Sequence, residues 1–136
     1  MADVNEIPPF PNPGVRLIKE DEHVAVWEEV FAPDQPTPPH RHTRDYIGIF
    51  LNAGELTITP LAGEPEEYTF IAGETKELPS ERGARFAFSP GTTVHSRVPL
   101  GGHAHLAVNE GKAADRAIII EIKGTATEKK VKEHTA

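Results

Sequence analysis

Cysteine is absent from this chain of 136 residues, and its absence removes several classes of chemistry at once. Without thiols there is no disulfide framework, no thiolate metal site and no cysteine nucleophile. Basic residues are also in the minority, because 14 Lys and Arg stand against 21 Asp and Glu, for a net charge of −7. Nucleic-acid binding depends on a basic footprint, so we expect no nucleic-acid partner.

Long apolar runs are missing as well. No stretch approaches the roughly 18 apolar residues that a membrane-spanning helix needs, so we expect no membrane partner. Residues 1–6 are acidic and are followed by prolines rather than by an apolar core, which is unlike a signal peptide. The sequence therefore predicts a cytoplasmic protein, and its length suits a single domain with a substantial core.

Glycine and proline, by contrast, are plentiful, with 11 and 13 residues. The tripeptide Ala-Gly-Glu recurs at 53–55, 62–64 and 72–74, a spacing typical of turns in a β-sandwich or barrel. No stretch carries a helical period of useful length. The chain between these breaks predicts strands at 15–19, 23–31, 46–51, 55–59, 66–71, 85–89, 93–98, 103–108 and 116–123.

The composition divides the chain into three parts. Residues 1–14 are rich in proline and predict an extended arm, residues 15–123 hold the predicted strands, and residues 124–136 form a polar, basic tail that we expect to be frayed. The last predicted strand is almost continuously apolar over 117–122, which indicates burial on both faces.

Histidine supplies the most informative motif. In Pro38-Pro39-His40-Arg41-His42, the two imidazoles stand at i and i+2, positions that share one face of an extended strand. Composition predicts roughly 0.35 His-x-His pairs by chance, and two occur, the second being His103-Ala104-His105. Neutral imidazoles on one face can converge on a metal ion, so the first pair predicts half of a metal site.

On this β background the chain resembles the cupin family, the small β-barrel metalloproteins. The first cupin motif runs from Gly through His-x-His and Glu to a final Gly, and His40, His42 and Gly54 match its centre and end. The second motif ends in His-x3-Asn, which His105 and Asn109 match, with one inserted residue ahead of them. The resemblance covers roughly residues 15–123 and implies an all-β cupin barrel of the double-stranded β-helix, or jelly-roll, type.

The family pattern also implies a third histidine ligand from the second motif. His105 has the His-x3-Asn spacing, whereas His95 follows the turn Pro90-Gly91 but has no Asn at the right offset. His103 shares the face of His105 in a regular strand, so it is a candidate for a supporting donor or the pocket rim. We predict His40, His42 and His105 as the metal ligands and keep His95 and His103 as alternatives.

The carboxylate of the first motif is missing. Its position falls on Tyr46 or Ile47, and Asp45 lies one residue early, on the opposite face of a regular strand. We therefore predict a three-histidine site with Tyr46 directed into the pocket, as a hydrogen-bond donor to bound substrate or oxygen or as a core aromatic. Gly48 and Phe50 share that inward face, while the outward set is predicted to pack against the other layer: Ile47, Ile49 and Leu51.

A divalent ion on three neutral imidazoles keeps its charge and has open positions, which favours a small anionic substrate. The resemblance to three-histidine non-haem cupins implies an Fe(II)-dependent dioxygenase acting on a small anionic or diketone-like substrate, although imidazole ligands also suit Zn, Ni, Mn or Cu. The alternatives are a non-catalytic cupin that binds metal or a small ligand, and a Zn- or Ni-dependent isomerase or lyase. Similar cupins are commonly dimers, so a homodimer is expected.

No general base is predicted. The three glutamates nearest the turns are interpreted as solvated charges: Glu55, Glu66 and Glu67.

Overall fold

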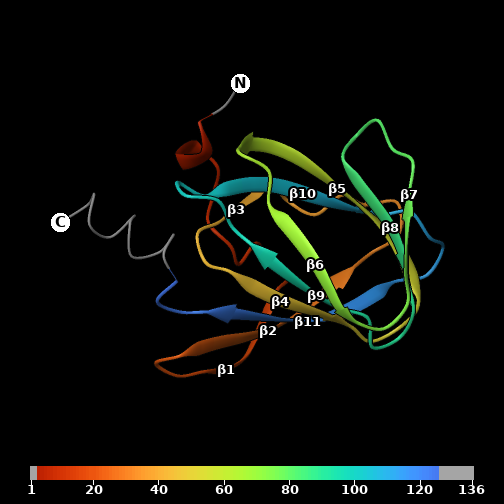
Figure 1. Cartoon of the computed structure of the whole chain (residues 1–136), viewed down its shortest axis with the longest axis horizontal. Helices are drawn as coiled ribbons and strands as arrows, with labels where there is room; N and C mark the ends of the chain where they lie inside the picture. The colour runs from red at the N-terminus through yellow and green to blue at the C-terminus, as the bar shows by residue number, and fades with distance from the viewer. Residues whose placement is uncertain (1–2, 126–136) are drawn as a thin grey trace.

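The computed structural model of the chain describes residues 3–125 as a barrel of two facing antiparallel sheets (Figure 1). The predicted all-β class is confirmed, since the helical structure of the described residues is confined to one short 3₁₀ turn, η1 (Val4–Glu6). Within this part of the chain no helix is long and apolar enough to cross a membrane. The predicted tail lies outside the described residues from position 126 onward.

From β2 onward most consecutive strands alternate between the two sheets, so the chain crosses from one sheet to the other repeatedly. The six-stranded sheet has the order β1 (Arg16–Glu20), β2 (Val24–Phe31), β11 (Asp115–Ile122), β4 (Tyr46–Phe50), β9 (Thr93–Arg97) and β6 (Glu67–Ala72). The five-stranded sheet has the order β3 (His40–His42), β10 (His103–Asn109), β5 (Gly54–Gly63), β8 (Ala84–Phe88) and β7 (Thr75–Leu78).

Two of these strands, β3 and β7, are absent from the predicted strand list. β3 has only three residues, too few to show an alternating pattern, although the residues at i and i+2 do share a face as expected. β7 is a short edge strand with a polar sequence, Thr-Lys-Glu-Leu, and strand pairing with β8 rather than side-chain burial defines it. Both strands are too short for a sequence pattern to reveal.

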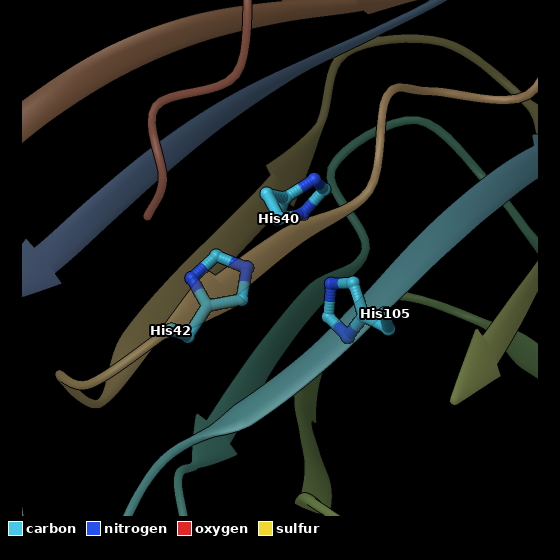
Figure 2. Close-up of side chains that lie close together, drawn as sticks. All are labelled: His40, His42 and His105. Atoms are coloured by element: carbon cyan, nitrogen blue, oxygen red, sulfur yellow. The ribbon is translucent and has the colours of Figure 1, made fainter. Parts of the chain in front are cut away.

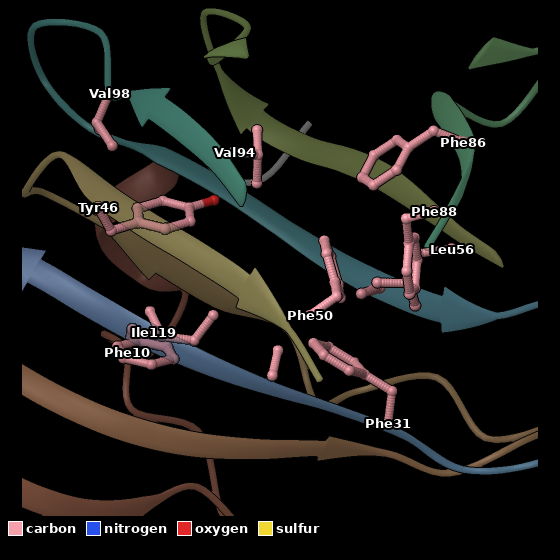
Figure 3. Close-up of a cluster of buried hydrophobic side chains, with 12 residues drawn as sticks. Phe10, Phe31, Tyr46, Phe50, Leu56, Phe86, Phe88, Val94, Val98 and Ile119 are labelled. Carbon is pink, nitrogen blue, oxygen red and sulfur yellow. The ribbon is translucent and has the colours of Figure 1, made fainter. Parts of the chain in front are cut away.

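The apolar core lies between the sheets (Figure 3). It is built from inward-facing aromatic side chains of both sheets, and the rings of Phe50 and Phe88 stack at a centroid distance of 3.8 Å across the barrel. Figure 3 shows Phe31 and Leu56 beside this stack and Tyr46 and Phe10 at the other end of the core. Side-chain alternation along each strand directs these rings between the sheets, and the rings of Phe10 and Tyr46 contact the histidines of β3 there.

The expectation that strand 116–123 is buried on both faces is wrong. In β11 the inward residues Ala117 and Ile119 are buried, Arg116 is exposed, and the outward isoleucines are only partly covered. The outward residues of β4 were also expected to pack against another layer, and this expectation is wrong. Ile47 and Ile49 are only partly buried, and Leu51, the residue after β4, is 48% exposed. The described residues place no second layer over the outer face of this sheet. The expected homodimer stays a prediction.

The N-terminal arm packs against its own barrel beside β3 (Figure 1). The backbone of Arg41 accepts a hydrogen bond from the amide of Phe10 at 2.9 Å and donates one to the carbonyl of Pro8 at 2.8 Å. These bonds place the Phe10 ring 4.9 Å from the ring of His42 and 5.7 Å from that of Trp27. The arm therefore covers one end of the barrel, over the histidines of β3.

Gly54, the final glycine of the first motif, is needed because a β-carbon there would overlap the buried carboxylate of Asp115. That carboxylate is 2% exposed and accepts a hydrogen bond from Asn52 at 3.0 Å, so it cannot move freely. We expect Gly54→Ala to lower the free energy of unfolding by about 2 kcal/mol, a typical cost of overpacking. Urea denaturation would measure the loss.

Gly48→Ala is the matched control for this prediction. A β-carbon at Gly48 would meet Val94 and Ile119 only at ordinary contact distances, 3.4 and 3.7 Å. Its cost should be well below that of Gly54→Ala. Equal costs at the two positions would contradict the role assigned to the Asp115 contact.

Candidate metal centre

Three buried histidines converge on the inner face of the five-stranded sheet (Figure 2). His40 and His42 come from β3, and His105 comes from β10, where it pairs directly with His40 across the two strands. The ring centroids lie 4.8 to 5.0 Å apart, and each residue is at most 4% exposed. One nitrogen from each ring lies within 4.8 Å of the others, which is a triangle that one metal ion can fill.

Hydrogen bonds at the far side of the rings decide which nitrogens remain for an ion. The Nδ1 of His40 lies 2.9 Å from the carbonyl oxygen of Pro38, and since a carbonyl can only accept, Nδ1 carries the proton and Nε2 keeps its lone pair. In His105, Nδ1 lies on the side of Glu66, and Figure 2 shows the other ring nitrogen on the side of His40 and His42. Both rings thus present a nitrogen to the shared space.

Burial sets the protonation state of the β3 histidines. Loss of solvent, followed by the nearby His105 ring, lowers the pKa of His40 to about 4. The same two causes hold the pKa of His42 well below its ordinary value. Both rings are therefore neutral at pH 7, the form that coordinates metals.

Glu66 is the most important residue that the sequence analysis missed, and its interpretation as a solvated charge is wrong. Its side chain is fully buried, with Oε1 2.9 Å from Nδ1 of His105, although the ring N–H is not aligned with it as in a good hydrogen bond. The hydroxyls of Tyr46 and Tyr68 donate to the same oxygen at 3.1 and 2.9 Å. A carboxylate therefore lies behind the histidine cluster, and it comes from the segment just before β6 rather than from the strand that the family motif implies.

The charge of Glu66 follows from these neighbours. Burial raises its pKa, but the contacts with His105, His103 and Tyr68 outweigh burial and hold the pKa below its ordinary value. The carboxyl is therefore ionised at neutral pH. A sequence signal for its burial existed, because Glu66, Tyr68 and Phe70 alternate along one strand face and two of the three are aromatic.

Tyr46 points inward as expected, and with Gly48 and Phe50 it lines the cavity beside the histidines. Its ring stacks on His42 at 4.3 Å, and its hydroxyl is engaged with Glu66. Burial and then the adjacent carboxylate raise the pKa of Tyr46 well above its usual value, so the hydroxyl keeps its proton. A direct role of Tyr46 toward substrate stays a prediction.

Three residues considered at the sequence level lie away from the cluster. Among residues 3–125, neither group of converging potential ligands includes His95 or Asp45. His95 is on β9, opposite Ile47 and Thr69, whose side chains face outward. Asp45 accepts a hydrogen bond from the amide of Val98, and the Asn109 amide group donates to two backbone carbonyls, so both stabilise loops.

A cavity of about 50 Å³ adjoins the three rings, and its walls are mostly apolar. Glu29 is its one acidic wall residue, facing inward from β2 and only 5% exposed. Burial raises the pKa of Glu29 to about 7. A long hydrogen bond from Asn12, at 3.5 Å, and the nearby His105 ring lower this pKa, but burial outweighs them. The alternation of Trp27, Glu29 and Phe31 is the signal that could have identified it.

Comparison with known proteins identifies the fold. No protein-family model and no curated protein matches this chain. Among solved structures, a cupin domain from Bordetella pertussis Tohama I aligns with a TM-score of 0.57 and 22% identity, over 85% of this chain and 99% of that one. An RmlC-like cupin family protein with a double-stranded β-helix fold, from Methanocaldococcus jannaschii, aligns with a TM-score of 0.54 and 17% identity, over 87% and 84%.

A third structure, a cupin 2 conserved barrel domain protein from Salinispora arenicola, aligns with a TM-score of 0.51 and 16% identity, over 88% of this chain and 83% of that one. These likenesses extend over most of each chain. They confirm the predicted architecture, two antiparallel sheets that form a double-stranded β-helix.

Proposed function

The chain has the cupin fold, and we propose that it binds a divalent metal ion through His40, His42 and His105 and acts as a non-haem Fe(II)-dependent dioxygenase on a small anionic or diketone-like substrate. The observation that supports this function is the convergence of three buried imidazoles, with no carboxylate in that set, beside a mostly apolar cavity. Imidazole ligands also suit Zn, Ni, Mn and Cu, and the choice of iron rests on the proposed reaction.

The residues present fit such an ion. The His40 tautomer is set by Pro38, so an unprotonated nitrogen is available within a buried site. Histidine ligands bind at about 2.0–2.1 Å, and anchoring of the far ring nitrogen by a carbonyl or carboxylate is the usual support for them. His40 has the first kind of support, and the contact of His105 with Glu66 supplies the second.

The surroundings favour a small anionic ligand. The three imidazoles are neutral, and Glu66 contributes one negative charge on the far side of His105. A divalent ion bound here would therefore leave the site with a net positive charge. The cavity of about 50 Å³ has room for few heavy atoms, and Phe10 and Phe31 form part of its apolar wall. A ferrous ion, when bound, supplies electrons to O₂, while Glu29 is placed to donate or accept a proton at a substrate oxygen.

We expect anaerobically Fe(II)-loaded protein to consume O₂ when a suitable diketone, catechol or thiol is added. An oxygen electrode, read across a panel of such compounds, is the measurement. His42→Ala should lower the substrate-dependent rate at least about 100-fold because one ligand of three is lost. His95→Ala, which changes a histidine outside the cluster, should leave the rate unchanged.

Stoichiometric iron without substrate-dependent O₂ uptake across the panel would contradict the dioxygenase. The cupin would then be a Zn- or Ni-dependent isomerase or lyase, or a module that binds a metal or small ligand without catalysis. Zinc- or nickel-loaded protein assayed anaerobically for isomer or cleavage products would separate these two classes.

A further inference from the structure

A second group of potential ligands lies behind the first and shares His105 with it. Glu66, at the start of the segment that leads into β6, approaches both histidines of β10: Oε1 is 2.9 Å from Nδ1 of His105 and 3.8 Å from Nε2 of His103. The side chains of all three residues are at most 5% exposed. The group includes neither His40 nor His42, so it is a separate arrangement.

The protonation of His103 makes this arrangement unusual. Its Nδ1 lies 2.7 Å from the carbonyl oxygen of Glu64, which can only accept, so Nδ1 carries the proton and Nε2 carries a lone pair. This Nε2 lies 3.8 Å from Oε1 of the Glu66 carboxylate. Two acceptors facing each other in a buried site repel unless a cation lies between them.

Other atoms of the group are also without suitable partners. Oε2 of Glu66 is buried and has no hydrogen-bond partner among residues 3–125, while Oε1 takes both tyrosine hydroxyls. Nδ1 of His105 has no aligned partner there either. Buried polar atoms are normally satisfied, so these atoms indicate a missing ligand.

We propose that Glu66, His103 and His105 form a second divalent-cation site, with His105 bridging it to the three-histidine site. Ligand atoms about 2.0–2.2 Å from one ion lie roughly 3.0–3.5 Å apart, and the observed separations of 2.9 and 3.8 Å bracket that range. Two imidazoles and one carboxylate suit Zn²⁺ or a similar first-row ion. Binding at both sites displaces the remaining ring proton of His105 to solvent, since each ring nitrogen then holds one ion.

An ion can reach this second site from outside the barrel. Glu66 and His103 line a surface groove together with Pro60, Pro65 and Gly83, and His40, His42 and His105 are not part of its wall. Entry through the groove does not pass the three-histidine site. The two sites therefore adjoin separate cavities, although they share the His105 ring.

Metal stoichiometry tests this proposal. The full chain without a His tag, stripped of metal and dialysed against buffered Zn²⁺, should bind two equivalents by elemental analysis. His103→Ala and Glu66→Gln should each bind one, as should His40→Ala, which damages the other site. His95→Ala should bind two. Glu66→Gln keeps the side-chain volume, so it remains informative if His103→Ala fails to fold in circular dichroism.

One equivalent in the wild type that His103→Ala and Glu66→Gln retain and His40→Ala loses, or two equivalents that persist in both His103→Ala and Glu66→Gln, would overturn the second site. The three-histidine site can fail separately: His40→Ala would then bind as much Zn²⁺ as the wild type while His103→Ala binds less. The two failures are distinguishable because each substitution affects only one ligand set.

Discussion

Replacing His105 with alanine should remove all tight metal binding from this protein. His105 is the member that the two groups of ligands share, so its loss leaves two potential ligands in each group. Two imidazoles, or one imidazole and one carboxylate, hold a divalent ion far more weakly than three ligands do, and we expect the affinity to fall at least about 100-fold. Elemental analysis after dialysis, with a chelator competition to measure the remaining affinity, would record the change.

His95→Ala is the matched control for His105→Ala, because both substitutions remove a histidine from a strand. His95 is partly buried and lies outside the cluster, whereas His105 is fully buried and belongs to it. The control should keep the wild-type metal content. Metal loss in His95→Ala with retention in His105→Ala would show that the ligand assignment is wrong. His40→Ala gives an intermediate case, since it leaves the group around Glu66 intact.

Glu29→Gln should stabilise the metal-free protein at alkaline pH and have little effect at acidic pH. Burial raises the pKa of Glu29 from 4.5 to about 7 in the folded state. Below pH 4.5 the carboxyl is protonated in both the folded and the unfolded chain, so it adds no pH-dependent cost. Between pH 4.5 and 7 the unfolded chain releases the proton while the folded chain keeps it, and the wild type loses stability.

The difference between the folded and unfolded pKa of Glu29 sets the size of this loss of stability. It corresponds to about 3 kcal/mol, and the loss is complete above pH 7. Glutamine cannot ionise, so Glu29→Gln avoids the loss. Urea denaturation of the apo protein at pH 4.5 and pH 8 would measure it. A stability difference between variant and wild type that does not grow with pH would contradict the buried, neutral state assigned to Glu29.

The adjacent Glu28 offers a control of opposite sign. It faces outward, and the hydrogen bond from Arg16, with the charge of Arg116, holds its pKa below the ordinary value. Its ionised form therefore favours the folded state above the unfolded-state pKa, and that contribution is lost as the pH falls through the folded pKa. Glu28→Gln should therefore give no gain in stability at pH 8.

The direction of the key histidines could be predicted because it follows from local rules, and the cupin fold because two short motifs resemble those of the family. A strand places i and i+2 on one face, so His40 and His42 had to point the same way once the segment was extended. The same rule placed Tyr46 and Gly48 on the inner face of β4. The motif around His105 identified which later strand would face them, and the structure brings these residues together.

The buried carboxylates required the tertiary structure. Glu66 follows a turn and Glu29 follows another glutamate, and such residues are usually solvated. Their burial depends on what the facing strands present: the two tyrosines and two histidines around Glu66, and the arm residue Asn12 beside Glu29. The one-sided burial of β11 has the same origin, because its own sequence does not reveal that residues 3–125 leave its outer face largely uncovered.

The sequence by itself determined the all-β class and the common face of the two β3 histidines, because strand periodicity and turn chemistry act over a few residues. The cupin architecture was implied by the resemblance of its two histidine motifs to those of the family. Only the tertiary structure decided that a carboxylate stands behind His105, that His95 lies apart and that the β10 histidines contribute to two groups of potential ligands. The physical reason is that a buried charge is stabilised by neighbours from other strands, and no local pattern in the sequence specifies those neighbours.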